Sequence, residues 1–282
     1  MSKPIVKLIS WSDFKGVPSE LADTNDADLM NKIEDKHQDC GSNTARLVEC
    51  AGRACYDSYG NGRSSESYHD HILEVGHGSV LEHVSFTFFL SNISRGLTHE
   101  LVRHRAGAAI SQRSTRYVDE SESDYVHHPL VEKHILQNDI LSDFSDQKDS
   151  VECSEVNSAI RDIEEAMSAS RKAYSSVVKF LEYKLTSQGL DKLAARKQAR
   201  GAARGYLGNA LMTEMVWSCN LRALRNVIEQ RANPAADAEI RVLANELYEV
   251  AIKICPEYLK DYEKIPCNDG IGFGLTTKHK KV

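Results

Sequence analysis

Hydrophobic and polar positions alternate along residues 83–90. Val84, Phe86, Phe88 and Leu90 fall on one face of an extended chain, and the hydroxyl side chains between them fall on the other. This period of two predicts a half-buried strand. The apolar segment at residues 4–10 predicts another strand.

Most other apolar positions recur every three or four residues, which is typical of amphipathic helices. The longest such stripe predicts a helix over residues 158–185. Further helices are predicted over residues 43–57, 67–75, 94–104, 190–201, 206–217, 220–231 and 235–255. Ser79, followed three residues later by Glu82, fits a capping box and predicts a helical turn, and Gly107 marks the expected end of the 94–104 helix.

These elements predict a helix-rich chain of mixed α/β, α+β class around a small, mainly antiparallel sheet. No linker divides the sequence, so residues 1–282 are expected to form a single domain. Hydrophobic residues make up 41% of the chain and charged residues 27%, which is an ordinary balance for a globular protein.

Several classes of protein are not supported by the composition. No apolar run is long enough to span a bilayer, and the N-terminus lacks an apolar signal core, so we expect a cytoplasmic protein, in the host cytoplasm if it is viral. The seven cysteines are dispersed and include no C-x-x-C pair, which favours reduced thiols over a disulfide framework or a zinc ribbon. The net charge of −6 argues against a general nucleic-acid binder.

The charge is distributed unevenly along the chain. Residues 119–156 hold eleven acids and two lysines and predict an exposed insertion or long loop with a short helix. Residues 95–117 hold five arginines and a single acid, Glu100. Such a cluster suits an anionic small molecule, because guanidinium groups match phosphate and carboxylate oxygens, but charge alone favours a solvated face or salt bridges.

The most unusual string runs from Arg103 to Tyr117. Before its turn, three polar residues spaced three and four apart share one face of the predicted helix: Glu100, Arg103 and His104. After the turn, three more would point the same way in an extended segment: Gln112, Ser114 and Arg116. Together they suggest a pocket for phosphate and a pyrimidine.

The helix predicted over residues 220–231 carries polar residues opposite its apolar stripe. Arg222 and Asn226 lie one turn apart on that side. Arg225 and Glu229 are interpreted as ordinary solvated charges on a surface helix.

Three motifs in order resemble the flavin-dependent thymidylate synthase family. The first, residues 77–83, reads H-x-[ST]-x-x-E-H, and the second, residues 103–117, reads Arg-His-Arg, eight residues, then Ser-x-Arg-Tyr. The third, residues 220–232, reads N-x-R-x-x-x-N-x-x-x-x-R-A. The resemblance covers roughly residues 45–118 and 157–258 and does not extend to the acidic segment.

The resemblance implies FAD as cofactor, dUMP as substrate, and NADPH and 5,10-methylenetetrahydrofolate as co-substrates, in a homotetramer whose sites are shared between subunits. It implies FAD contacts from Ser79, Arg103, His104, Arg105, Gln112, Asn220, Arg222 and Asn226. It implies dUMP contacts from Glu100, Arg103, Gln112, Ser114, Thr115, Arg116, Arg204 and Arg231. Arg231 and His77 are the implied catalytic residues: Arg231 favours ionisation of the pyrimidine, and His77 lies near the flavin.

The implied reaction is reductive methylation of dUMP to dTMP without an enzyme nucleophile. Ser114 is the natural candidate for a nucleophile, but its segment offers no histidine or carboxylate at catalytic spacing, so we assign it to substrate binding. No metal, nucleic acid or membrane is expected to bind.

Two alternatives belong to other functional classes. A metal-dependent enzyme could use the cluster of His69, His71, His77 and His83, although the first two point apart on a helix. A nucleic-acid or interaction protein could use the arginines of residues 95–117 and the basic region 184–204, but the overall acidity counts against it.

Overall fold

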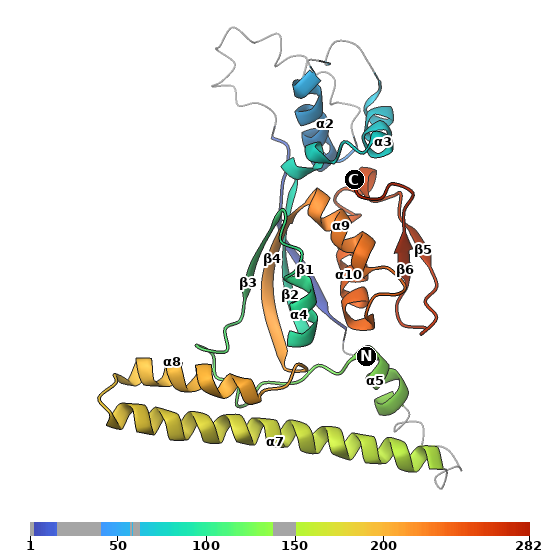
Figure 1. Cartoon of the computed structure of the whole chain (residues 1–282). Coiled ribbons are helices and arrows are strands. Elements are labelled where there is room, and N and C mark those ends of the chain that lie inside the picture. Colours follow the sequence, from blue (N-terminus) through green and yellow to red (C-terminus); the bar gives the residue numbers. More distant parts are fainter. Residues whose placement is uncertain (1–2, 16–40, 57, 59–62, 138–150) are drawn as a thin grey trace. The chain divides into compact units, whose positions relative to one another are not determined.

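The computed structural model describes residues 3–15, 41–56, 58, 63–137 and 151–282. Within them the strands are β1 (Ile5–Trp11), β2 (Ser85–Ser94), β3 (Ala108–Gln112), β4 (Met212–Asn220), β5 (Glu263–Ile265) and β6 (Gly274–Thr276). The helices are α2 (Asn43–Tyr56), α3 (Ser65–Val75), α4 (Arg95–Leu101), α5 (Pro129–Val131), α7 (Val151–Ser187), α8 (Lys192–Ala203), α9 (Leu221–Arg231) and α10 (Ala238–Ala251). A 3-10 turn covers Gly78–His83. Figure 1 shows these elements along the chain.

The described chain divides into two compact units. The first, which we call the arm unit, comprises Met1–Pro4, Ser91–Leu101 and Ser111–Met215. The second, which we call the core unit, comprises Ile5–Leu90, Val102–Ile110 and Val216–Val282.

The strands form two small sheets. One has the strand order β1-β2-β4-β3, and the other is the antiparallel pair β5-β6. The side chains of Val84, Phe86, Phe88 and Leu90 are fully buried, which confirms the predicted half-buried strand. In the core unit, the ring of Phe88 stacks on that of Trp217 of β4 at a centroid distance of 5.9 Å. The helix-rich α+β class with a small antiparallel sheet is therefore confirmed.

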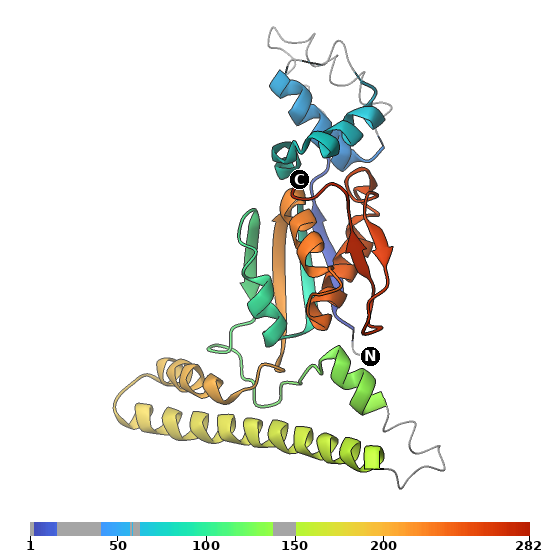
Figure 2. The same ribbon diagram turned by 45° about the vertical axis from the view of Figure 1, so that its right-hand side comes forward.

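Two helices pack beside the sheet in the core unit. The apolar stripe of α9 is buried, and α10 buries Ile240, Leu243 and Leu247. Helix α10 contacts β1 on one side, and both helices contact β6 on the other (Figures 1 and 2). This packing holds α9, which carries the third sequence motif, in a fixed orientation within the unit.

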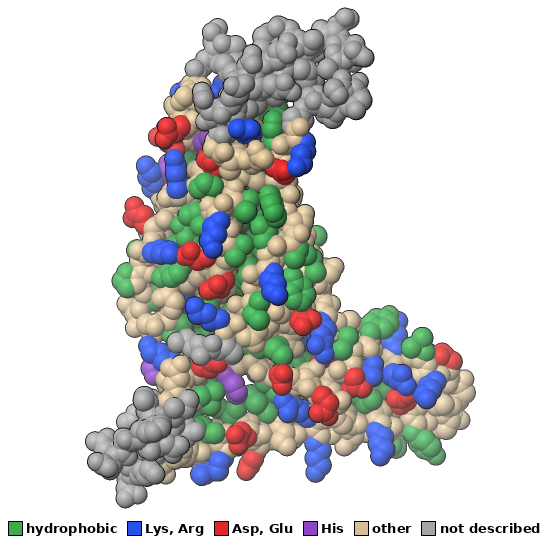
Figure 3. Space-filling view, turned by 180° about the vertical axis from the view of Figure 1, so that it is seen from behind, with side chains coloured by type: hydrophobic (Ala, Val, Ile, Leu, Met, Phe, Trp, Pro, Cys, Tyr) green, Lys and Arg blue, Asp and Glu red, His purple; other side chains and the backbone are tan. Residues whose placement is uncertain are grey.

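The arm unit is dominated by the helical pair α7 and α8. Helix α7 has 37 residues and so extends over about 55 Å. Helix α8 packs against α7. Asp191 caps the start of α8, because its side chain accepts hydrogen bonds from the backbone N–H groups of Leu193 and Ala194. Acidic and basic side chains are interspersed along this pair, with a few hydrophobic ones between them (Figure 3).

The acidic segment is only partly solvated. Glu120 is 1% exposed and pairs with Arg113 at 3.2 Å, and Tyr174 of α7 accepts from the Glu120 backbone N–H at 3.3 Å. The predicted short helix corresponds to α5, whereas residues 151–156 belong to α7. Whether the segment is an insertion in a single domain stays a prediction. Residues 138–150, within this segment, lie outside the described residues.

Several local predictions are wrong. Residues 206–217 do not form a helix, because β4 begins at Met212. Helix α4 ends at Leu101, so Arg103 and His104 lie in the following turn and do not share a helical face with Glu100; Gly107 therefore does not end that helix.

Two further predictions about local conformation fail. The extended segment ends at Gln112, and Ser114 begins a turn in which its carbonyl accepts from the backbone N–H of Tyr117 at 3.1 Å. Ser79 makes no capping hydrogen bond, although the predicted helical turn is present at Gly78–His83.

Among the described residues, no helix is long and apolar enough to cross a membrane.

Candidate functional site

The first turn of α9 is fixed by its capping residue. Asn220 adopts extended backbone angles, and its side-chain oxygen accepts from the backbone N–H of Ala223 at 2.8 Å. Its own N–H donates to the carbonyl of Gly107 at 2.8 Å. Gly107 has a φ of +67°, and a Cβ there would lie 2.4 Å from the Asn220 amide, so only glycine permits this approach.

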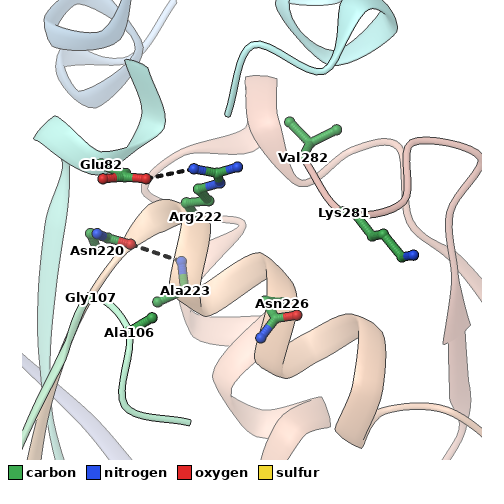
Figure 4. A pocket seen from close by; sticks show the side chains of 9 residues that line it. All are labelled: Glu82, Ala106, Gly107, Asn220, Arg222, Ala223, Asn226, Lys281 and Val282. Atoms are coloured by element: carbon green, nitrogen blue, oxygen red, sulfur yellow. Dashed lines mark hydrogen bonds and ion pairs between the residues drawn. The ribbon is translucent and has the colours of Figure 1, made fainter. Parts of the chain in front are cut away.

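A hollow of about 350 Å³ opens beside this turn, as Figure 4 shows. Arg222 projects from the first turn of α9, and its Nη1 pairs with Oε1 of Glu82 at 2.7 Å. Asn226 lies one turn further along and accepts a hydrogen bond from Gln230 at 2.8 Å. Lys281 also lines the hollow, so the described side chains around it include two cations and one acid.

A second hollow, of about 660 Å³, lies further along α9. Ala106, Ala223 and Asn226 line both hollows, so the two lie next to each other. We call them together the α9 groove. The second hollow is further lined by side chains from the Arg-His-Arg segment and from the end of α9: Arg103, His104, Arg105, Gln230 and Arg231. Among the described residues that line it, none is an acid, so it is strongly cationic.

His104 and Arg231 contact each other in this second hollow. Arg231 Nε donates to His104 Nε2 at 2.9 Å. Burial lowers the pKa of His104, and the positive charges of Arg231 and Arg103 lower it further. His104 is therefore a neutral acceptor at Nε2, and its ring proton resides on Nδ1.

Ser79 and His77 lie elsewhere in the core unit. Ser79 is exposed on the 3-10 turn, and neither residue lines the α9 groove. The ring of His77 stacks on Tyr56 at a centroid distance of 5.7 Å, and its Nε2 lies 3.3 Å from the Tyr56 hydroxyl. Their roles stay predictions.

The arm unit holds most of the predicted dUMP residues. Thr115 and Arg204 line one hollow of about 300 Å³. Arg116 packs against Gly201 of α8, one turn before Arg204: a Cβ on Gly201 would lie 3.7 Å from the Arg116 side chain. Gln112, at the end of β3, donates to the hydroxyls of Thr98 and Thr213 at 3.1 and 3.5 Å. Glu100 lies on α4.

Ser114 begins the turn that carries Thr115 and Arg116. Within the described chain, its hydroxyl oxygen accepts from the backbone N–H of Arg116 at 3.4 Å and contacts no histidine or carboxylate. The remaining predicted dUMP residues, Arg103 and Arg231, belong to the core unit.

Sequence reasoning missed several lining residues. In the core unit these are Glu82 and Lys281, which are distant in sequence from α9, and Gln230, which the four-residue spacing from Asn226 could have indicated. In the arm unit it is His99, whereas Arg95 belongs to the arginine cluster of residues 95–117 but was not assigned to the substrate pocket.

The alternative of a metal centre gains no support. Within the residues that the structure describes, no three histidine, cysteine or acidic side chains gather as metal ligands. His69 is buried, and its Nδ1 hydrogen-bonds with the hydroxyl of Tyr258 at 2.5 Å. Both His69 and His71 lie on α3, the predicted helix, and His69 is buried while His71 is partly exposed.

Comparison with known proteins identifies the family of the chain. The family model described as thymidylate synthase complementing protein matches residues 39–257. The flavin-dependent thymidylate synthase of Mycolicibacterium gilvum is 40% identical over 230 residues, which cover 80% of this chain and 82% of the relative. That of Mycobacterium tuberculosis is 37% identical over 269 residues, which cover 94% and 92% respectively. The chain belongs to the family of flavin-dependent thymidylate synthases.

Proposed function

We propose that this protein converts dUMP to dTMP by reductive methylation, with FAD as cofactor, 5,10-methylenetetrahydrofolate as carbon donor and NADPH as reductant. The observation that carries the proposal is the α9 groove, where the second and third sequence motifs meet. Membership of the family supports the same reaction.

The residues of the α9 groove fit a flavin dinucleotide. Its pyrophosphate is anionic, and the groove offers guanidinium forks and amide groups with few acids. Gly107 keeps the backbone close to the Asn220 cap and leaves the wall of the groove without a side chain. We propose that the groove residues Arg103, His104, Arg105, Asn220, Arg222 and Asn226 hold FAD, together with Ser79 and Gln112. When bound, FAD supplies the hydride and one-carbon transfer chemistry.

Arg231 is proposed as the residue that polarises the pyrimidine. It is a permanent cation at the end of α9, and its Nε donates to the neutral His104. A cation beside the uracil ring lowers the free energy of a negative charge at N3. His77, stacked on Tyr56, is proposed to assist turnover near the flavin.

The dUMP site is proposed to use Glu100, Arg103, Gln112, Ser114, Thr115, Arg116, Arg204 and Arg231. Ser114 binds substrate and does not act as a nucleophile, because its hydroxyl contacts a backbone N–H and not a general base.

We further propose a homotetramer in the cytoplasm with sites shared between subunits. Large apolar side chains on the arm unit support subunit contacts, since Phe180, Tyr183 and Leu193 are 63%, 73% and 71% exposed. Mass photometry of the purified protein would test the assembly, and a monomer at working concentration would contradict it.

An absorption spectrum of the purified protein, followed by anaerobic NADPH, tests the cofactor. We expect flavin bands that bleach with NADPH, and dTMP formation after dUMP and the folate are added. A colourless protein that also fails to take up FAD would refute the proposal.

The role of Arg231 can be tested by Arg231→Ala, with Arg161→Ala on α7 as the matched control. Arg161 is an exposed arginine of the arm unit that lines no described hollow. We expect dTMP formation to be lost in the first variant and kept in the second. Normal dTMP formation by Arg231→Ala would remove Arg231 from the mechanism.

A further inference from the structure

Helix α4 turns two basic residues toward a hollow in the arm unit. Arg95 and His99 are four residues apart, so they lie on the same side of the helix. Both line the hollow of about 300 Å³ that also contains Thr115 and Arg204. We call this cavity the α4 hollow. Neither Arg95 nor His99 is among the residues that the family resemblance assigns to substrate.

The α4 hollow is cationic. Among the described residues that line it there are two arginines and a histidine, and none is an acid. Burial lowers the pKa of Arg95; the nearby Glu120 opposes this, and the charge of Arg204 adds to it. Glu120 is already engaged, because it pairs with Arg113 at 3.2 Å and accepts from the hydroxyl of Ser123. Two guanidinium groups therefore share a small cavity in which an anion would relieve their repulsion.

The backbone around Arg95 is held firmly. The Arg95 N–H donates to the carbonyl of Leu211 at 3.0 Å, and the Gly96 N–H donates to that of Asn209 at 2.9 Å. The Arg95 carbonyl accepts from the hydroxyl of Thr98 at 2.8 Å. These bonds fix the start of α4 against the loop after Arg204, so Arg95 approaches the hollow from an anchored backbone.

The wall formed by that loop is open. A Cβ added at Gly205 or Gly208 would meet no atom within 4 Å. Both glycines line the α4 hollow, so this side offers space for a ligand. The cavity volume lies at the lower end of the range for small-molecule sites, about 300–1,000 Å³. A compact anionic group fits this space and charge better than an extended ligand.

We infer that Arg95 binds the phosphate group of the nucleotide monophosphate substrate, together with Arg204 and Thr115. The inference rests on the proposed dUMP site, since Thr115 and Arg204 are placed there. A phosphate monoester carries close to two negative charges at neutral pH, which matches two guanidinium groups better than a carboxylate does. Arg95 is thus a determinant of nucleotide over nucleoside.

A structural role for Arg95 makes a different prediction. Its Nη1 lies 3.4 Å from the carbonyl of Arg113, which is a long contact. If that contact were its only function, replacing Arg95 would affect phosphorylated and unphosphorylated ligands equally.

Calorimetric titration of the FAD-loaded protein with dUMP and with deoxyuridine distinguishes phosphate binding by Arg95 from a purely structural role. The variants are Arg95→Gln, Arg95→Lys and the control Arg161→Gln, each checked by thermal melting. We expect Arg95→Gln to weaken dUMP binding about 10–100-fold, as for loss of a charge-assisted hydrogen bond, and to leave deoxyuridine binding unchanged. Arg95→Lys keeps the charge but loses the fork, so its loss should be intermediate.

Inorganic phosphate is the second probe and does not depend on nucleoside affinity. It should compete with dUMP in the wild type, and its inhibition constant should rise in Arg95→Gln. The inference is overturned if Arg95→Gln binds dUMP like the wild type, if dUMP and deoxyuridine lose affinity equally, or if phosphate competes equally in both proteins. A wild type that binds FAD but not dUMP refutes the proposed substrate and this inference with it.

Discussion

Replacing Asp261 by Asn tests how α9 is anchored in the core unit. Arg225 of α9 is 2% exposed, and its guanidinium forms a two-pronged pair with Asp261, with N–O distances of 2.8 and 2.9 Å. The same guanidinium donates to the carbonyls of Tyr258 and His279 and lies over the ring of Tyr262. It therefore ties the buried side of α9 to the C-terminal segment.

Breaking a buried ion pair from one side leaves an uncompensated charge, which costs about 3–5 kcal/mol. The backbone acceptors of Arg225 survive the change, so we expect a loss near the lower limit, about 3 kcal/mol in the free energy of unfolding. Urea unfolding followed by circular dichroism at one fixed protein concentration measures this value. The matched control is Asp70→Asn: Asp70 pairs with Lys260 at 3.4 Å, and the two side chains are 51% and 49% exposed. That variant should lose less than about 1 kcal/mol.

The pH dependence of unfolding provides an independent check on the contribution of the Arg225–Asp261 pair. Burial alone would raise the pKa of Asp261, but hydrogen bonds and the charge of Arg225 outweigh it, so its pKa lies below the usual value. The pair therefore contributes fully above the unfolded pKa of about 4 and is lost as the pH falls through the lower folded pKa. The deficit of Asp261→Asn should shrink as the pH drops below about 4. Equal losses for Asp261→Asn and Asp70→Asn, or a deficit that grows in acid, would refute the argument.

Two further predictions concern the α9 groove. Arg231→Gln should raise the pKa of His104, because it removes one of the charges that lower it while burial remains; a histidine titration by NMR that is unchanged from the wild type would contradict this. Gly107→Ala should cost at least about 1–2 kcal/mol, from the positive φ of +67° and the contact with the helix cap, and should weaken FAD binding. Gly189→Ala is its control, because Gly189 also has a positive φ but meets no atom within 4 Å; equal losses in urea unfolding and equal FAD affinity would refute a role for the close approach.

Local periodicity predicted the elements in which the apolar residues themselves recur at regular spacing. The strand at residues 83–90 and helix α9 follow their periods of two and of three to four, so both were found from sequence. Strand β4 was missed because its buried positions include Thr213 as well as Met215, Trp217 and Cys219. A threonine facing inward hides the alternation, and the apolar residues just before the strand imitate helical spacing.

For Arg225, the periodicity places the residue on the buried face of α9, but the sequence does not show that its charge is buried there. It lies four residues after Leu221 and three before Ile228, so it occupies the apolar stripe of α9, yet its charge suggested a solvated residue. The structure corrects this reading, because the side chain is buried against Asp261, 36 residues away. A buried charge can be recognised only with its partner, and the sequence does not state which distant acid meets which arginine.

The residues of the candidate site also differ in whether local sequence or tertiary packing brings them together. Arg222 and Asn226 were predicted because a single helix turn brings them together, whatever the rest of the fold does. Glu82 and Lys281 reach the same hollow from segments about 140 and 60 residues away from Arg222, through packing that no local pattern encodes. Arg95 is intermediate: its spacing from His99 was visible, but which face of α4 meets Arg204 depends on the loop at Asn209 and Leu211. Arg95 and His99 share one face of α4, which the sequence shows. The hollow that they line exists only because the segment containing Arg204 packs against that face. Comparing dUMP with deoxyuridine binding in Arg95 variants therefore tests the effect of this tertiary packing directly, because the helix itself would be unchanged.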